Sequence, residues 1–362
     1  RWWVASRFRR KLSWLCCAWV TMSETKPVQK PAGNPWLRAL PGILISMAAI
    51  AVLYFLVDLD ELRHAFELAD YGALPIVLVL FLGSLVTRSL AWRTILDEKV
   101  SFANAFLVLN QGYLLNNVLP FRLGELGRAM ILGRISGLGF WRVLPTIVVE
   151  RVFDLAIAVG MLLSSLPFVV GADWARSVLP LAGAVVVLGF AALFALAVRP
   201  KWVLGILQAI TRPWPRLEAW VVEKVQSFLL GLSALKSPGR FLRVLVWMLL
   251  AWGFNFSWYY LLLRTFVPEA APLWMVFAIA ATSLGVAVPS SPAYVGVLEG
   301  VMVAALSLFG VAEALSLAFA LVAHAVYFVV TGIIGIYAFG KQGQSLSGVY
   351  KQLLTRSTAE AE

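Results

Sequence analysis

Ionised side chains occur within or beside stretches of apolar residues, and these are the side chains that could do chemistry. A charge placed in the hydrocarbon of a membrane costs about 2.5–3.5 kcal/mol on insertion scales, so each is a candidate functional residue. The candidates are Arg88; Arg122, Glu125 and Arg128; Glu150, Arg151 and Asp154; and Glu299.

The segment 120–128 predicts a site for an anionic headgroup. Arg122, Glu125 and Arg128 are spaced i, i+3 and i+6, so they share one face if the segment is helical. Two guanidinium groups held by a carboxylate can bind a phosphate bidentately. Further headgroup-binding candidates are Asn116, Asn117 and Arg88. The alternative is an interfacial helix whose arginines only set topology, with Arg88 reaching the membrane surface.

The segment 150–154 places two carboxylates around one arginine. Glu150 and Asp154 are four residues apart and face the same way on a helix, with Arg151 between them. Crowded carboxylates favour proton uptake by one of them, which would suit gating by proton coupling. The alternative is a structural ion-pair cluster that joins this helix to Arg88 or to the segment 122–128.

Glu299 lies in the sequence Gly296-Val297-Leu298-Glu299-Gly300, whose paired glycines permit close helix approach. We expect it to meet Arg122, Arg128 or Arg151 and to take part in gating or proton coupling. His324 lies within the last apolar stretch, and we expect a packed, hydrogen-bonded histidine rather than a proton relay.

Composition places these residues in a membrane protein. Hydrophobic residues make up 61% of the chain and charged residues 14%, against about 45–50% and about 25% in soluble domains. The net charge is +11, and most of the basic residues lie in the connections between apolar stretches. In that position they indicate how the protein is oriented in the membrane rather than a nucleic-acid partner. Cys16 and Cys17 are adjacent, and no metal-ligand spacing, phosphate-binding loop or nucleophile elbow occurs. We therefore expect no metal, no cofactor, no ATPase and no enzyme.

The apolar pattern predicts an all-α polytopic membrane protein with about six full spans. The expected spans are 40–57, 74–92, 144–170, 178–198, 244–263 and 315–339. An acidic amphipathic segment, 58–70, should lie on the outer surface, and the basic connection 199–243 contains an amphipathic helix at 221–235.

Two shorter apolar units are interrupted by proline and predict re-entrant or broken helical hairpins. The first is 103–119 with the segment that follows it, and the second comprises 273–289 and 295–309. The expected hairpin breaks are Pro120, Gly124, Pro289, Pro292 and Gly296. Breaks in helices at membrane depth occur only where the non-helical backbone is buried in protein or lines a water-filled cavity. The alternative is two ordinary proline-kinked helices.

The distribution of basic residues predicts that both termini are cytoplasmic. In that orientation all Lys and Arg residues except Arg63, Arg151, Arg176 and Arg264 fall on the cytoplasmic side. The halves 74–170 and 244–339 then have opposite topology, the inverted repeat typical of alternating-access carriers.

The expected domains are a cytoplasmic segment 1–38, a single membrane domain 39–340 and a cytoplasmic tail 341–362. Residues 1–21 either precede a true start at Met22 or form an interfacial anchor.

Three ordered motifs resemble the membrane region of lysylphosphatidylglycerol synthases and their free-standing, flippase-like relatives. They are NNVLPFRLGELGRAMIL (116–132), VVERVFDL (148–155) and VPSSPAYVGVLEG (288–300), and the resemblance spans roughly residues 38–340. The matching residues are Asn116, Pro120, Arg122, Gly124, Glu125 and Arg128; Glu150, Arg151 and Asp154; and Pro289, Pro292, Gly296 and Glu299. Ala293 stands where many relatives have glycine.

The resemblance implies a lipid flippase or transporter in the cytoplasmic membrane. Its substrate would be a phosphate-bearing lipid, either an aminoacyl-phospholipid or a polyprenyl-linked lipid, and a separate cytoplasmic or membrane synthase would be its partner. Only residues 340–362 follow the last expected span, so we do not expect aminoacyl transfer by this chain. The alternatives are a membrane enzyme or accessory subunit of lipid-linked glycan synthesis, and a scaffold that recruits a synthase through 199–243.

Overall fold

The computed structural model describes residues 47, 50–55, 57–119, 122–169, 184, 187–192, 194–196, 198–232, 236–286, 292–344 and 348–349. Within these ranges every regular element is helical. The expected segment 1–38 lies outside the described residues, and so does the expected tail 341–362 except for residues 341–344 and 348–349. Pro120, Pro289 and much of the expected spans 40–57 and 178–198 also lie outside them.

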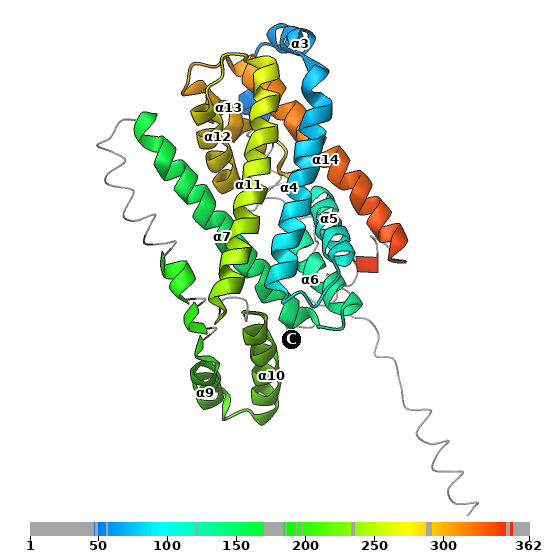
Figure 1. The fold of residues 1–362 in the computed structure, drawn as a ribbon, viewed down its shortest axis with the longest axis vertical. Helices are drawn as coiled ribbons and strands as arrows, with labels where there is room; N and C mark the ends of the chain where they lie inside the picture. The colour runs from blue at the N-terminus through cyan, green and yellow to red at the C-terminus, as the bar shows by residue number, and fades with distance from the viewer. Residues whose placement is uncertain are drawn as a thin grey trace, which may run out of the picture.

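Three long apolar helices form the frame of the molecule. They are α4 (Leu74–Ile95), α11 (Pro238–Phe266) and α14 (Glu313–Lys341). Among the described residues, these three have the length and apolar composition to cross a membrane individually, which confirms three of the expected spans. Helices α4 and α11 run side by side along the long axis of the molecule (Figure 1).

Helix α7 (Phe140–Ser165) crosses this frame diagonally and is followed by the short η2 (Leu166–Phe168). Its 26 residues are long enough to span a bilayer. Its apolar run is interrupted by Glu150, Arg151 and Asp154, and these side chains must therefore find partners inside the protein.

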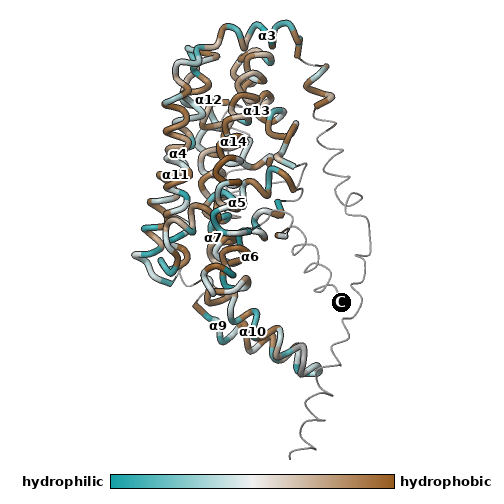
Figure 2. Tube along the Cα trace, turned by 90° about the vertical axis from the view of Figure 1, so that its right-hand side faces the viewer, coloured by the Kyte–Doolittle hydropathy of each residue, from teal (hydrophilic) through white to brown (hydrophobic). Residues whose placement is uncertain are grey.

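Two helical hairpins occur where the proline-interrupted units predicted them. The first is α5 (Phe102–Val118) with α6 (Leu123–Ile135). The second is α12 (Pro272–Gly285), η4 (Pro292–Tyr294) and α13 (Val297–Ser307). Each helix is shorter than the roughly 20 residues that a span requires. The two hairpins lie in opposite halves of the molecule along its long axis (Figures 1 and 2).

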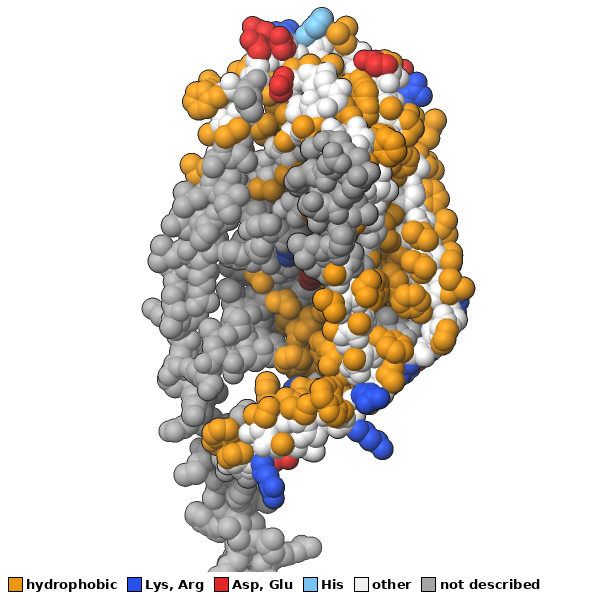
Figure 3. All heavy atoms as spheres, turned by 90° about the vertical axis from the view of Figure 1, so that its left-hand side faces the viewer, with side chains coloured by type: hydrophobic (Ala, Val, Ile, Leu, Met, Phe, Trp, Pro, Cys, Tyr) orange, Lys and Arg blue, Asp and Glu red, His pale blue; other side chains and the backbone are white. Residues whose placement is uncertain are grey.

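The two ends of the molecule carry opposite charge. Helix α3 (Leu59–Leu68) caps one end, and its first turn is closed by Asp58, whose Oδ1 accepts hydrogen bonds from two backbone N–H groups. Helices α9 (Pro200–Thr211) and α10 (Pro215–Gly231) lie at the other end. Figure 3 shows acidic side chains mainly near α3, basic side chains near α9 and α10, and an apolar surface between them.

The first hairpin packs through glycines, and this corrects the expected role of Gly124. Gly124 lies in the first turn of α6, where a Cβ would come within 2.0 Å of the Gly112 carbonyl oxygen on α5. Its function is close helix approach rather than chain reversal. The reversal falls earlier, at Arg122, whose φ of 55° is left-handed.

We predict that Gly124→Ala destabilises the protein, because the added methyl group must push α5 and α6 apart. Overpacking of this kind costs typically 1–3 kcal/mol. The measurement is the unfolding midpoint of purified protein in detergent, with Gly160→Ala as the matched control because a Cβ there meets nothing within 4 Å. Equal midpoints for the two variants would contradict the packing described.

The second hairpin turns through strained residues. Ala293 and Tyr294 have φ angles of 57° and 63°, a region that favours glycine, and Gly296 follows at 84° just before α13. Gly296 is the residue that precedes α13, and Pro292 begins η4.

We predict that Ala293→Gly stabilises the protein by about 1 kcal/mol, because the left-handed conformation costs an L-residue about that much. Unfolding in detergent checks this, and Ala293→Val should shift the midpoint in the opposite direction. A lower midpoint for the glycine variant would show that the turn is not strained.

Candidate functional site

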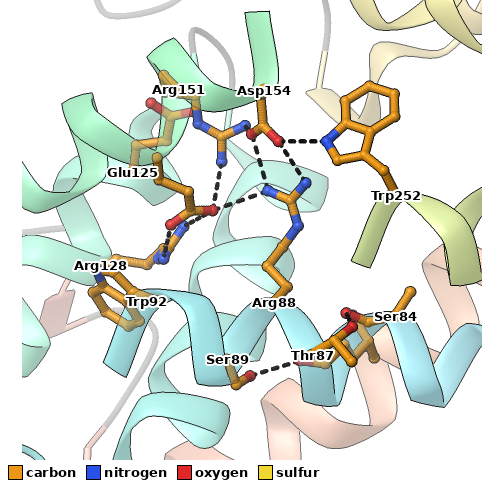
Figure 4. A network of polar contacts seen from close by, with 12 residues as sticks. Ser84, Thr87, Arg88, Ser89, Trp92, Glu125, Arg128, Arg151, Asp154 and Trp252 are labelled. Carbon is orange, nitrogen blue, oxygen red and sulfur yellow. Dashed lines mark hydrogen bonds and ion pairs between the residues drawn. The ribbon is translucent and has the colours of Figure 1, made fainter. Parts of the chain in front are cut away.

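Arginines and carboxylates from three helices, α4, α6 and α7, form one cluster of buried and partly buried side chains (Figure 4). Arg88 on α4 donates to Asp154 through both terminal nitrogens, at 2.9 Å and 2.7 Å, and to Glu150 Oε1 at 3.0 Å. Arg128 on α6 donates to Glu150 Oε2 at 2.8 Å. Because α7 contributes both carboxylates, the cluster ties α4 and α6 to α7.

Arg151 extends this cluster toward the first hairpin. Its Nη1 donates to Asp154 Oδ2 at 2.9 Å, and its Nε lies 3.1 Å from Glu125 Oε1. Trp252 on α11 donates its indole N–H to Asp154 Oδ1 at 3.0 Å. The structural ion-pair cluster considered as an alternative for segment 150–154 is therefore present, and it includes Arg88 and Glu125 as well.

The position of Arg128 differs from the prediction that it shares one helix face with Arg122 at a spacing of i, i+6. Its side chain is 1% exposed, pairs with Glu150 and covers the ring of Trp92 at 4.1 Å from the ring centre. Arg122 precedes α6 in a left-handed conformation, so the helical i, i+6 spacing does not apply to it. The two arginines therefore do not form one phosphate fork.

A cavity of about 200 Å³ lies beside the cluster. Its wall is drawn from both hairpins and from α4, α7, α11 and α14. The polar residues on it are Ser84, Arg88, Tyr113, Asn116, Arg122, Glu125, Arg151, Asn255, Tyr259, Thr282, Ser283, Tyr294 and Tyr327. Figure 3 shows charged side chains recessed among apolar ones midway between the two ends of the molecule.

Arg122 is the cavity cation with the most unused hydrogen-bonding capacity. Its Nε donates to the Tyr294 hydroxyl at 3.1 Å and lies 4.0 Å from Glu125. Within the described residues its two terminal nitrogens have no recorded protein partner. The Arg122–Tyr294 contact also joins the breaks of the two hairpins, because Arg122 precedes α6 and Tyr294 closes η4.

The two predicted asparagines have different positions. Asn116 lines the cavity, and its Oδ1 accepts a hydrogen bond from the Gly124 N–H at 2.8 Å, which holds the start of α6. Asn117 donates to the Thr331 hydroxyl at 3.2 Å and links α5 to α14. Asn117 is not among the cavity-lining residues.

Glu299 does not meet Arg122, Arg128 or Arg151. Its Oε2 accepts from the Gly296 N–H at 2.7 Å, and its Oε1 lies 2.5 Å from His324 Nδ1 on α14. The carboxylate turns back to cap its own helix, and the neighbouring helix supplies the histidine. The expectation of a packed, hydrogen-bonded His324 is confirmed. Glu299 also borders a second, largely apolar cavity of about 210 Å³.

The sequence reasoning missed the aromatic residues of the site. Tyr113, Tyr259, Tyr294 and Tyr327 line the main cavity, and Trp252 holds Asp154. These residues lie within apolar stretches rich in aromatic residues, so their spacing did not distinguish them from the other aromatic residues there. No group of three or more His, Cys, Asp or Glu residues in the described part of the chain is arranged to hold a metal ion.

The helices and their buried charge cluster define an integral membrane protein with an internal polar cavity. The sequence model described as the lysylphosphatidylglycerol synthase TM region matches residues 40–335. The chain belongs to this family.

Two relatives are UPF0104 membrane proteins of Methanothermobacter thermautotrophicus. One is 27% identical over 331 residues, which cover 84% of this chain and 96% of the relative. The other is 28% identical over 120 residues, which cover 33% of this chain and 36% of the relative, so the match spans about a third of that protein. No solved structure matches this chain significantly.

We predict that Arg128 and Arg122 differ sharply in their contribution to stability. Arg128→Ala leaves Glu150 without its most buried partner, and breaking a buried pair costs about 3–5 kcal/mol. Arg122→Ala removes a side chain that is 24% exposed, and we expect about 1 kcal/mol or less. Denaturant unfolding in detergent measures both. Equal losses would contradict the assignment of Arg128 to the scaffold and of Arg122 to the cavity.

Proposed function

We propose that this protein moves a phosphate-bearing lipid across the cytoplasmic membrane without an ATPase of its own. The observation that carries the proposal is the cavity of about 200 Å³ between two short helical hairpins, with Arg122 on its wall and no partner recorded among the described residues for its terminal nitrogens. A guanidinium with free terminal nitrogens is suited to bind phosphate. Membership of the lysylphosphatidylglycerol synthase TM family is consistent with a role that involves lipids.

The proposed topology is an inverted repeat with both termini in the cytoplasm and about six full spans. The two hairpins occupy opposite halves of the molecule, as hairpins that enter from opposite membrane faces would. The basic end at α9 and α10 would face the cytoplasm and the acidic end at α3 the exterior. Such pairs of broken helices enclose the substrate site in many carriers.

The cavity suits a headgroup whose acyl chains stay in the membrane. Arg122, Glu125 and Arg151 line its polar side. Its apolar side includes Phe81 and Met302. A headgroup in the cavity can therefore replace its hydrogen bonds to water with hydrogen bonds to these polar side chains, while its acyl chains remain outside the site.

Gating would reside in the contacts that hold the hairpins together. The Arg122–Tyr294 hydrogen bond joins the two breaks, and an anion on Arg122 would compete with it. The Glu299–His324 pair joins the start of α13 to α14, so a movement of the second hairpin would have to alter this contact. Glu150 and Asp154 share their arginines, so a change in one of these ion pairs would redistribute the others.

We predict that Arg122→Ala abolishes the appearance of the headgroup on the far leaflet of liposomes, because the phosphate loses its cation. The measurement is the labelling of lipid by a membrane-impermeant reagent after reconstitution. Arg264→Ala is the matched control, since Arg264 is exposed at the far end of α11. Wild-type rates in the Arg122 variant, with protein folded and inserted, would refute this site.

The same liposomes separate transport from the alternative of a membrane enzyme in lipid-linked glycan synthesis. Glu299 and His324, at 2.5 Å, have the geometry of an acid–base pair. A transporter leaves the mass of the labelled lipid unchanged, whereas an enzyme changes it. A separate synthase that supplies the lipid is the proposed partner, and binding to it can be tested by co-purification.

A further inference from the structure

Helix α9 packs against the rest of the protein through only part of its apolar surface. Its Val203 and Leu204 contact the core cluster that contains Leu229 of α10 and Met248 of α11. Pro200 lies in the first turn of α9, where a missing N–H costs no hydrogen bond, so a new helix can begin there. One side of α9 is thus fixed on the molecule, at the end shown lowest in Figure 1.

Another part of the apolar surface of α9 is exposed. Trp202, Ile206 and Ile210, which we call the apolar row, are 67%, 42% and 62% exposed. Because they are spaced four residues apart, they lie on one face of α9, and the exposed Lys201 and Gln208 lie on the opposite face. A row of large exposed apolar side chains rimmed by polar ones marks a surface that binds a partner or a membrane.

Basic side chains flank the apolar row. Arg199 precedes α9, Lys201 lies in its first turn and Arg212 follows its last residue, and we call these three the basic set. All three are exposed, and their side chains have no recorded partner among the residues that the structure describes. The whole connection 199–243 contains eight Lys or Arg residues and two Glu, so it carries six net positive charges. This charge favours an anionic partner.

The segment before α9 indicates that this partner is a lipid surface. The preceding helix, Val187–Leu196, is apolar, and its Val187, Leu188 and Phe194 are exposed. This helix and α9 together have the apolar composition of a membrane span, but they are bent by 79° at the break between them. Such a bend is expected where a chain leaves the hydrocarbon and then follows the membrane surface. A soluble protein partner would not require the apolar row to follow directly on an exposed apolar helix.

Tryptophan residues at this end of the molecule favour the same partner. Trp214, in the turn between α9 and α10, and Trp220 on α10 are exposed, as is Trp202 of the apolar row. Tryptophan is enriched at membrane–water interfaces, where its ring lies at the level of the headgroups. Figure 3 shows apolar and basic side chains together at this end. This combination is typical of a helix that lies in the interface of an anionic membrane.

We infer that α9 docks on the surface of a membrane that contains anionic phospholipid. The apolar row enters the boundary between headgroups and acyl chains, and the basic set binds lipid phosphates. The inference goes beyond the proposed function, because it concerns the lipid of the membrane surface rather than a lipid in the cavity.

Nitroxide labels on the full-length protein in liposomes test the inference. Cys16 and Cys17 are the only cysteines of the chain, so a Cys16→Ser/Cys17→Ser background accepts a label at one chosen position. Ile206→Cys places the label on the apolar row, and Gln208→Cys is the matched control on the opposite face. Power saturation measures how often each label meets oxygen, which concentrates in hydrocarbon, and an uncharged nickel chelate, which stays in water. The liposomes contain phosphatidylcholine alone or phosphatidylcholine with phosphatidylglycerol.

We expect the label at position 206 to meet oxygen more than nickel and the label at position 208 to show the reverse, with the larger contrast in liposomes that contain phosphatidylglycerol. Equal access of nickel to both positions in both liposomes would overturn the inference, because the apolar row then faces water. Protection of position 206 from both reagents would also overturn it, because a second copy or another protein then covers the row. The same contrast in both liposomes would refute the preference for anionic lipid.

Charge variants test the basic set. Lys201→Gln/Arg212→Gln should lower the ratio of immersed to water-exposed label at position 206, in liposomes that contain phosphatidylglycerol, by roughly fivefold for each cation removed. Arg63→Gln/Arg264→Gln removes the same charge at the opposite end of the molecule and should leave this ratio unchanged. All four side chains are exposed, so these variants are expected to fold. An unchanged ratio in the first variant would refute the contact of the basic set with lipid, and none of these measurements depends on transport.

Discussion

The cost of placing ionised side chains inside a membrane governs how this protein is built. Each arginine and carboxylate of the central cluster would be strongly unfavourable alone in hydrocarbon, so each is held by partners on another helix. Arg88, Arg128 and Arg151 share Glu150 and Asp154, and these bonds bring α4, α6 and α7 together. The same requirement explains Trp252, whose indole reaches in from α11 to complete the hydrogen bonds of Asp154.

The cavity follows from two short hairpins that end inside the molecule rather than crossing it. In the first hairpin, α5 and α6 approach closely because Gly112 and Gly124 have no side chains at their contact. The second turns through left-handed Ala293 and Tyr294. These turns bring Arg122 and Tyr294 into contact, and some side chains on the cavity beside them have no recorded partner among the residues that the structure describes. A site that binds ligands needs such unused capacity, whereas a site that only stabilises the fold does not.

Much of the architecture could be predicted from the sequence. The spans at α4, α11 and α14, the two interrupted hairpins and the membership of the family all follow from apolar length, proline positions and ordered motifs. The partners of the charges could not be predicted in the same way. Arg128 was expected beside Arg122 and instead lies buried against Glu150 and Trp92, because a left-handed residue at Arg122 breaks the helical spacing.

The sequence by itself determined that the chain is a membrane protein with several costly charges in its apolar segments, since composition and local periodicity are properties of the chain alone. Only the tertiary structure decided which charges neutralise one another and which face the cavity. Glu299 illustrates the difference, because its capping of Gly296 is local but its partner His324 lies on another helix. Contacts between distant segments depend on helix packing and backbone strain at the breaks, and neither is encoded in residue spacing.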